Sequence, residues 1–217
     1  MRDKKTIDYT LYLVTDRDLF PGIRLAAAVE QAIRGGVTVV QLREKNACSR
    51  DFHTIAREVK EITDRYSVPL IINDRLDIAL AVDAAGAHIG QDDLPARAAR
   101  EVLSGRGKIL GVSAATAAEA LQAQADGADY IGAGSVFATG TKKGVRPLLR
   151  EELTKIKQAV NIPVVAIGGI NESNVRLLQG TGIDGIAVVS AILGRDDVQK
   201  AAADLKRKLT FIQAGGK

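Results

Sequence analysis

The sequence predicts a single-domain (β/α)8 TIM barrel of the α/β class, and three observations carry this prediction. Eight short runs rich in Val, Ile and Leu recur along the chain, and most are apolar on both faces, as parallel strands covered by helices are. Stretches with apolar residues at helical spacing, such as LAAAVEQAIR, fill the gaps between them. Eight strands alternating with about eight helices in 217 residues close most economically into a barrel.

The expected strands follow one another at regular intervals. They are LYLVTD, VTVVQLRE, VPLIIND and GAHIGQDD in the first half, and KILGVS, DYIGAG, IPVVAIGG and DGIAVVS in the second. Expected helices include residues 25–34, 51–66 and 117–125. Four glycines stand where a residue just past a helix C-terminus is expected: Gly36, Gly86, Gly127 and Gly182.

We expect one domain over residues 1–217, with an N-terminal extension at 1–10 and a C-terminal tail at 210–217. A doubly wound open sheet is the competing architecture. It usually carries a glycine-rich dinucleotide turn after an early strand, and none follows LYLVTD.

Composition and charge narrow the class of protein. The net charge of +4 comes from 30 basic and 26 acidic residues mixed along the chain, without a basic block interleaved with aromatics, which argues against a nucleic-acid partner. Cys48 is the only cysteine, so no internal disulfide can form. The start MRDKKTIDYT lacks an apolar signal region and no apolar run is long enough for a membrane span. We therefore expect a cytoplasmic protein without membrane contact, and the sequence leaves open whether it is a homo-oligomer.

Polar residues gather where the expected strands stop, which in a barrel of this kind is where active sites are built. Alternation puts Gln41 and Arg43 on one face, and Lys45 joins them if the chain stays extended. The remaining strand ends carry Asn73 and Asp74, Asp92 and Asp93, Ser113, a Thr- and Lys-rich loop, Gly168 and Gly169, and Ser190.

These side chains fall into two chemical sets. Arg43, Lys45 and Lys142 are partners for an anion, with Gln41 and Asn73 as neutral hydrogen-bonding groups. Asp74 and Asp93 are oxygen ligands of the kind that magnesium takes together with water and phosphate oxygens. We therefore expect a diphosphate held with Mg2+. The glycines after the seventh strand and the segment after the eighth occupy positions where many barrels bind a phosphate.

Plainer interpretations stand beside these. A single Arg or Lys at a strand end is commonly a solvated rim residue. Asn73 and Asp74 are also suited to cap the next helix, and residue chemistry alone does not separate Asp92 from Asp93. We expect His88 to be a packed, hydrogen-bonded strand residue away from the mouth, and His53 and Cys48 to be surface positions.

The chain resembles the thiamine phosphate synthase family, also called thiamine-phosphate pyrophosphorylase. The resemblance rests on LYLVTD, GGVTVVQLREK, LIINDRLDIAL, GAHIGQDDLP, ILGVSA, GADYIGAGSVFATGTKK, VVAIGGI and GIAVVSAI, in the family's order from Leu11 to Ala191. It implies a transferase that joins hydroxymethylpyrimidine diphosphate to thiazole phosphate with Mg2+, releasing diphosphate.

The resemblance also implies roles for single residues. The pyrimidine diphosphate would contact Gln41, Arg43, Lys45, Asn73, Ser113 and Lys142, of which Arg43, Lys45, Ser113 and Lys142 would be catalytic. Asp74 and Asp93, rather than Asp92, would hold the metal. The thiazole phosphate would lie in a cradle of Thr139, Thr141, Gly169, Val189 and Ser190, with the loop from Thr139 to Lys142 lying across both substrates.

The chain departs from the family at Ser135 and Ala138, where proline is frequent, and at Ala115, where histidine is common. These changes affect the expected thiazole side. The rivals are a thiazole tautomerase-like relative, a non-catalytic barrel that binds thiamine precursors and regulates a partner, and another phosphate-binding barrel isomerase. The pair Asp74 and Asp93 argues against an isomerase, which has no need of it.

Overall fold

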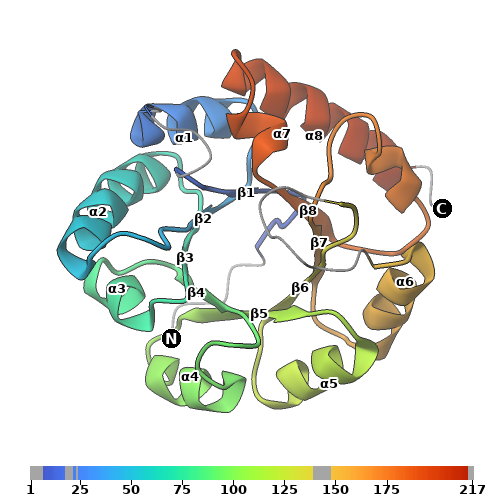
Figure 1. Cartoon of the computed structure of the whole chain (residues 1–217), viewed down its shortest axis with the longest axis horizontal. Coiled ribbons are helices and arrows are strands. Elements are labelled where there is room, and N and C mark those ends of the chain that lie inside the picture. The colour runs from blue at the N-terminus through green and yellow to red at the C-terminus, as the bar shows by residue number, and fades with distance from the viewer. Residues whose placement is uncertain (1–6, 18–21, 23, 139–147, 215–217) are drawn as a thin grey trace.

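Eight parallel strands close into a barrel in the computed structural model, which describes residues 7–17, 22, 24–138 and 148–214. Each strand pairs with its neighbours in sequence, and the first pairs with the last (Figure 1). The strands are β1 (Leu11–Val14), β2 (Val39–Leu42), β3 (Leu70–Asn73), β4 (Gly86–Ile89), β5 (Ile109–Ala114), β6 (Tyr130–Gly134), β7 (Val164–Ile167) and β8 (Gly185–Val188). The prediction of a single (β/α)8 barrel is confirmed.

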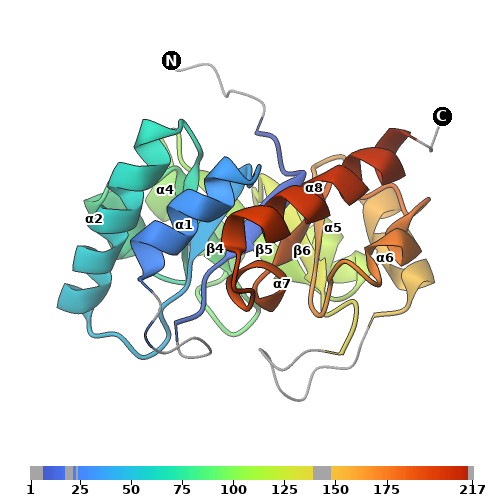
Figure 2. The same cartoon turned by 90° about the horizontal axis from the view of Figure 1, so that it is seen from above.

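The helices form a ring outside the strands (Figure 1). They are α1 (Leu25–Arg34), α2 (Ser49–Arg65), α3 (Leu76–Ala81), α4 (Ala96–Leu103), α5 (Ala117–Ala125), α6 (Arg150–Ala159), α7 (Ser190–Leu193) and α8 (Val198–Ala214). A short 3-10 helix, η1 (Val175–Leu178), stands between β7 and β8. The last helix packs beside the first and so closes the ring (Figure 2). Within the described residues, every helix is too short or too polar to cross a membrane.

Side chains along each strand alternate between two cores. In β1, Leu11 and Leu13 belong to the large apolar cluster under the helices, whereas Tyr12 and Val14 belong to a smaller cluster inside the barrel. This is the alternation of a strand buried on both faces, and it explains why the strands read as continuous apolar runs. It also means that Gln41, in β2, points into the barrel rather than toward a helix.

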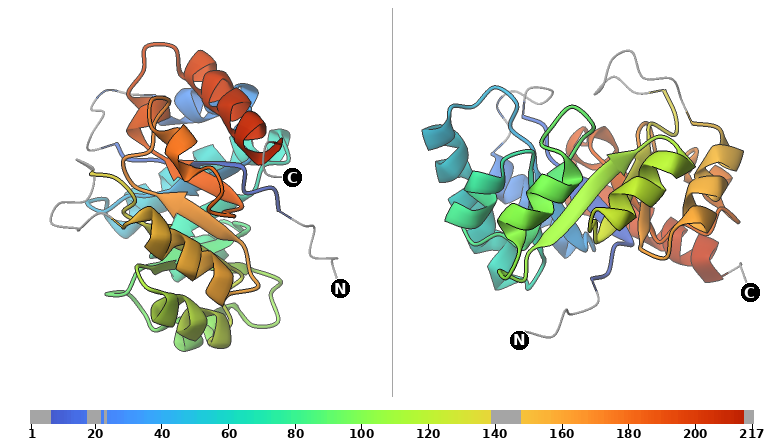
Figure 3. Two further views of the ribbon diagram at one scale, coloured as in Figure 1. Left: turned by 90° about the vertical axis from the view of Figure 1, so that its right-hand side faces the viewer. Right: turned by 90° about the horizontal axis from the view of Figure 1, so that it is seen from below.

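The segment before β1 covers the end of the barrel where the strands begin (Figures 2 and 3). This end is opposite the mouth formed by the C-terminal ends of the strands. Tyr9 is buried there, and its ring lies 4.8 Å from that of Tyr130. Residues 7–10, which the sequence assigns to an extension, therefore include part of the interior core. At the other terminus, α8 continues to Ala214 and so includes residues 210–214 of the expected tail.

Two of the expected helix-ending glycines behave as such. Gly36 and Gly127 follow α1 and α5 with φ of 106° and 95°, the left-handed conformation that glycine adopts at little cost. The expectation for Gly86 is wrong, because Gly86 is the first residue of β4. The left-handed position after α3 belongs to Asp83, with φ 52°. Gly86 is instead a close-approach residue, since a Cβ there would lie 2.1 Å from the carbonyl oxygen of Ile109.

Candidate active site

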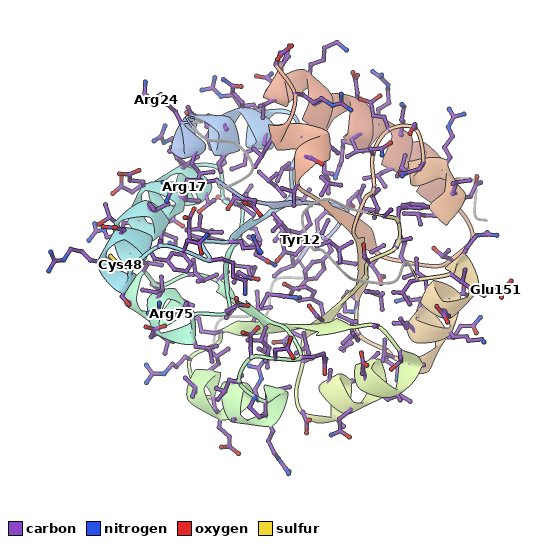
Figure 4. All side chains as sticks on the ribbon, in the orientation of Figure 1. Tyr12, Arg17, Arg24, Cys48, Arg75 and Glu151 are labelled. Carbon is purple, nitrogen blue, oxygen red and sulfur yellow. The ribbon has the colours of Figure 1, made fainter. Side chains whose placement is uncertain are left out.

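The C-terminal ends of the strands bring the expected polar residues of β2 to β5 to one mouth of the barrel. Figure 4 looks along the barrel, with Tyr12 in the middle of the ring of strands and Arg17 beyond the end of β1. Around this mouth the structure places the predicted residues Gln41, Arg43, Lys45, Asn73, Asp74, Asp93 and Ser113, at the ends of β2, β3, β4 and β5 or just after them. Residues Thr139, Thr141 and Lys142 lie outside the described residues.

Arg43 is held in place by residues that follow β1. Its Nη1 donates to Asp16 Oδ2 at 2.6 Å, and its backbone N–H donates to Thr15 Oγ1 at 3.1 Å. The Asp16 side chain is only 6% exposed while that of Arg43 is 22% exposed. Next to this pair, Arg17 makes a two-pronged ion pair with Glu44, with both N–O distances at 2.8 Å. The guanidinium of Arg43 is thus oriented by a buried carboxylate and still reaches solvent.

Lys45 forms an ion pair with Asp74, and the carboxyl group of Asp93 lies within hydrogen-bonding reach of Asp74. Asp74 has φ 62°, a left-handed backbone that Asp tolerates better than most residues. Its backbone N–H donates to the His88 carbonyl at 2.8 Å. The two carboxylates therefore come from successive strand ends and meet over β3 and β4.

The electrostatics of the two carboxyl groups differ. Burial raises the pKa of Asp74 above its ordinary value, and the Asp93 carboxyl adds to this shift while Lys45 opposes it. Burial also disfavours ionisation of Asp93, but the Gly90 N–H, Asp74 and Lys45 outweigh it and hold the pKa of Asp93 below its ordinary value. Asp93 is therefore the more readily ionised of the two carboxyl groups.

The structure separates Asp93 from Asp92. Asp93 Oδ2 accepts a 2.7 Å hydrogen bond from the Gly90 N–H, which turns its side chain back toward β4, whereas Asp92 is exposed. The capping alternative is wrong for Asn73 and Asp74, because the N-cap of α3 is Arg75 and no side chain caps that helix. The carboxylates at this mouth are therefore not helix caps.

Gln41 and Ser113 are joined inside the barrel by three further side chains. Gln41 Nε2 donates to the Tyr12 hydroxyl at 2.8 Å, and that hydroxyl lies 2.8 Å from the hydroxyl of Tyr130. The chain continues through His88, whose Nδ1 lies 3.0 Å from the Tyr130 hydroxyl and whose Nε2 lies 3.0 Å from Ser113 Oγ.

The expectation that His88 lies away from the mouth is therefore wrong. It is a packed, hydrogen-bonded strand residue as expected, but alternation along β4 turns its ring into the barrel, where it contacts a candidate site residue. A strand residue near the end of a barrel strand faces either the helices or the interior, and its direction depends on strand register.

The ends of β7 and β8 form the other side of the mouth. Gly168 and Gly169 have φ of 102° and 65°, and a Cβ on Gly169 would lie 2.4 Å from the Ala138 carbonyl oxygen. Val189 is the N-cap of α7, and Ser190, its first residue, is exposed. Only glycine permits this close approach of backbone at the end of β7, where a phosphate group would need access to main-chain N–H groups.

Phosphorylated ligands are the class of substrate that this arrangement suits. A (β/α)8 barrel with cations and paired carboxylates at one side of its mouth, and glycine turns at the other, is typical of enzymes that act on phosphate esters.

Comparisons with known proteins identify the family. A family model described as thiamine monophosphate synthase matches residues 11–192. The chain is 59% identical over 201 residues to a thiamine-phosphate synthase of Clostridium tetani, covering 93% of this chain and 96% of that protein. It is 55% identical over 209 residues to one of Clostridium beijerinckii, covering 96% of this chain and all of the other.

A solved structure agrees with these matches. A thiamine phosphate pyrophosphorylase of Pyrococcus furiosus superposes with a TM-score of 0.86 at 42% identity, covering 94% of this chain and 97% of that one. The chain belongs to the thiamine monophosphate synthase family. It is a transferase of thiamine biosynthesis with thiamine-phosphate synthase function.

Some residues of this site were not predicted from the sequence. Asp16 ends the LYLVTD run, and its position after a buried strand was a usable signal, although nothing in the sequence pairs it with Arg43. Tyr12 and Tyr130 read as ordinary apolar strand residues. Their signal was indirect: Gly111 and Gly132 interrupt strands, and such glycines mark a close approach by another group.

Proposed function

We propose that this chain condenses hydroxymethylpyrimidine diphosphate with thiazole phosphate to form thiamine phosphate and diphosphate, assisted by Mg2+. The observation that carries this proposal is the pair Asp74 and Asp93 beside Lys45, at the same mouth as Arg43. Carboxylates paired next to cations suit a metal-assisted diphosphate, because a monophosphate ester can be neutralised by Arg and Lys side chains without a metal.

The residues present fit a magnesium ion. In the described part of the mouth, the carboxylates of Asp16, Asp74 and Asp93 stand against the cations of Arg43 and Lys45. A diphosphate would be repelled by this excess of negative charge unless a divalent cation entered with it. Among the described residues no group of three or more His, Cys, Asp or Glu side chains could hold a metal, at this mouth or elsewhere, so a magnesium site here would rest on the pair Asp74 and Asp93 alone. Two carboxylates are the set that magnesium takes when water and phosphate oxygens complete its shell.

Asp74 and Asp93 would hold the ion, which supplies charge neutralisation for the diphosphate. Arg43 contributes a guanidinium whose orientation is fixed by Asp16, so its donors are arranged before substrate arrives. With Asp74 and Asp93 holding the ion, Lys45, which now pairs with Asp74, would be available to a phosphate oxygen. Lys142, which lies outside the described residues, would add a further positive charge near the leaving group.

The reaction suits a dissociative course. The bond between the pyrimidine methylene carbon and the diphosphate oxygen breaks, the diphosphate leaves with both bonding electrons, and the thiazole nitrogen donates its lone pair to the resulting carbocation. Catalysis then depends on leaving-group neutralisation and on alignment of the partners rather than on a side-chain nucleophile. The pyrimidine ring would lie between Gln41, Asn73 and Ser113, above the interior of the barrel.

The thiazole phosphate would bind across the mouth from the diphosphate. Gly169, Val189 and Ser190 lie at the ends of β7 and β8, the usual phosphate position of such barrels. Thr139 and Thr141, which lie outside the described residues, would contribute hydroxyl groups to this phosphate. In this arrangement the two phosphate groups are held on opposite sides and the two rings meet over the centre.

The proposal is tested by incubating the purified protein with both substrates and Mg2+, and measuring thiamine phosphate after oxidation to a fluorescent product. Product should form, chelation should abolish it, and added Mg2+ should restore it. Full turnover in excess chelator would contradict the magnesium proposal.

A second assay distinguishes the synthase from the thiazole tautomerase. The position of His88 near the mouth favours the tautomerase, since histidine is a usual proton-transfer group. The protein is given the non-aromatic thiazole tautomer without the pyrimidine diphosphate. Isomerisation should be negligible, because the His88 ring is buried and its Nε2 faces Ser113 Oγ. Rapid isomerisation in that arm would favour the tautomerase.

A further inference from the structure

The side chains inside the barrel form a hydrogen-bonded series from Gln41 through Tyr12, Tyr130 and His88 to Ser113. One contact decides which partner donates in each bond of this series. Gln41 presents its Nε2, a donor, to the Tyr12 hydroxyl. Tyr12 must therefore accept from Gln41 and direct its own single proton to its other neighbour, the Tyr130 hydroxyl. Tyr130 in turn has its proton left for His88 Nδ1.

The same accounting fixes the histidine and the serine. The two His88 contacts fit either tautomer by themselves, and a hydroxyl proton from Tyr130 on Nδ1 selects the one that carries its proton on Nε2 and directs it to Ser113 Oγ. Ser113 accepts there, so its own hydroxyl proton points away from His88. At the opposite end, the amide of Gln41 uses its nitrogen inside the barrel and keeps its carbonyl oxygen as its acceptor.

The side chains of this hydrogen-bonded series are buried, so the direction of each hydrogen bond is fixed. Tyr12 and Tyr130 are each 1% exposed, Gln41 is 5% exposed and His88 is 8% exposed. Space for the two rings is made by glycines of β5 and β6. A Cβ on Gly111 would lie 2.1 Å from Tyr130 Cζ, and one on Gly132 would lie 2.9 Å from His88 Cε1. Reversing a single bond would leave one buried donor without an acceptor, which is costly.

We propose that Tyr12, Tyr130 and His88 are positioning residues that select the pyrimidine substrate by fixing Gln41 as an acceptor and Ser113 as a donor. The proposal rests on the proposed function and extends it to substrate choice. Tyr12, Tyr130 and His88 need not touch the ligand, because they act through Gln41 and Ser113 at the two ends of the hydrogen-bonded series.

The pattern matches an aminopyrimidine. The pyrimidine of thiamine carries an exocyclic amine next to a ring nitrogen, which is a donor beside an acceptor. The Gln41 carbonyl oxygen accepts from the amine, and the Ser113 hydroxyl donates to the ring nitrogen. The oxo analogue has the opposite pattern, a carbonyl acceptor beside a ring N–H donor, although its shape and its diphosphate are the same. A site built for specific hydrogen bonds rejects a ligand that leaves them unmade.

The experiment compares two diphosphates, the aminopyrimidine and its oxo analogue, on the whole enzyme. The first is measured as a substrate, by KM and kcat, and the second as a competitive inhibitor, by Ki. Tyr130→Phe and Tyr12→Phe each remove one hydroxyl and keep the ring. Tyr9→Phe is the matched control, because it removes the same group from a ring stacked on Tyr130 that is not a member of the chain.

The wild type and Tyr9→Phe should prefer the amine strongly and equally. The preference is measured as the ratio of Ki for the oxo compound to KM for the amine. In Tyr130→Phe and Tyr12→Phe this ratio should fall by about tenfold, which is the contribution of about one hydrogen bond. The change should lie mainly in KM and Ki, with kcat within about threefold, because the chain orients the ring and does not contact the leaving group.

Two results would overturn the proposal while leaving the proposed function intact. One is an unchanged preference in both variants, even if activity falls, since that is the signature of a merely structural role. The other is an equal loss of preference in Tyr9→Phe. Failure of the wild type to form thiamine phosphate is a separate outcome, which would overturn the proposed function and this inference with it. Melting temperatures of all four proteins identify any change caused by unfolding.

Discussion

Replacing Asp93 by Asn should weaken magnesium binding far more than the same change at its neighbour Asp92. The substitution removes one negative charge. It keeps an oxygen that can accept the 2.7 Å hydrogen bond now donated by the Gly90 N–H to Asp93 Oδ2. A unit charge 4 Å from a dication is worth about 2 kcal/mol in bulk water, and about four times more near a protein surface. The lower figure corresponds to a rise of about 30-fold in the Mg2+ concentration needed for half-maximal rate.

The matched control, Asp92→Asn, changes the same charge one residue away on an exposed side chain. Screening by salt should keep its effect within about twofold. Both variants are assayed for initial rate of thiamine phosphate formation over a range of Mg2+ concentrations, with substrates saturating. Melting temperatures within a few degrees of wild type would show that the fold is kept. Equal shifts in the two variants would refute the assignment of Asp93 as a ligand and reduce it to one of several surface charges.

Three further outcomes follow from the structure and the sequence. Gly111→Ala should destabilise the protein by about 1–3 kcal/mol in thermal unfolding, because its Cβ would overlap the Tyr130 ring, and an unchanged melting temperature would argue against that packing. Burial raises the pKa of Asp8, but hydrogen bonds from Thr10 and the charge of Lys206 outweigh it and lower that pKa. Ionised Asp8 therefore stabilises the fold above about pH 4, and this effect is lost as the pH falls through the lowered pKa. The difference in melting temperature between wild type and Asp8→Asn should shrink in that pH range, and a constant difference would contradict the ion pair. Lys142→Ala should cut kcat by about 100-fold while Lys143→Ala stays mild, and equal losses would show only a basic surface.

The barrel was predictable because its signal is repeated. Each strand is apolar on both faces, so a run such as VVAI reads as a buried parallel strand whatever its register, and eight such runs leave few alternatives. Asp74 and Asp93 were predictable for a related reason: the fold places every strand end at the same mouth, so polar residues there meet without further information.

Contacts that depend on side-chain direction were not predictable. His88 was placed away from the mouth because the sequence does not say which face of β4 it occupies, and the hydrogen bond to Ser113 reverses that expectation. The pairing of Arg43 with Asp16 joins residues 27 positions apart through the register of β1 and β2. Gly86 reads like a helix end in the sequence because glycine serves both left-handed turns and close strand contacts, and only the backbone angle separates the two.

The pairing of Arg43 with Asp16 and of Lys45 with Asp74 has a consequence for competition among anions. Each of these cations already has a negative partner, so a small anion without a metal must displace a carboxylate and gains little by doing so. We therefore expect inorganic phosphate and sulfate to be poor competitors at this mouth when they arrive without a metal. A diphosphate that arrives with a divalent ion satisfies the carboxylates and the cations at once, so the ligand-free site stays available in a medium crowded with other anions.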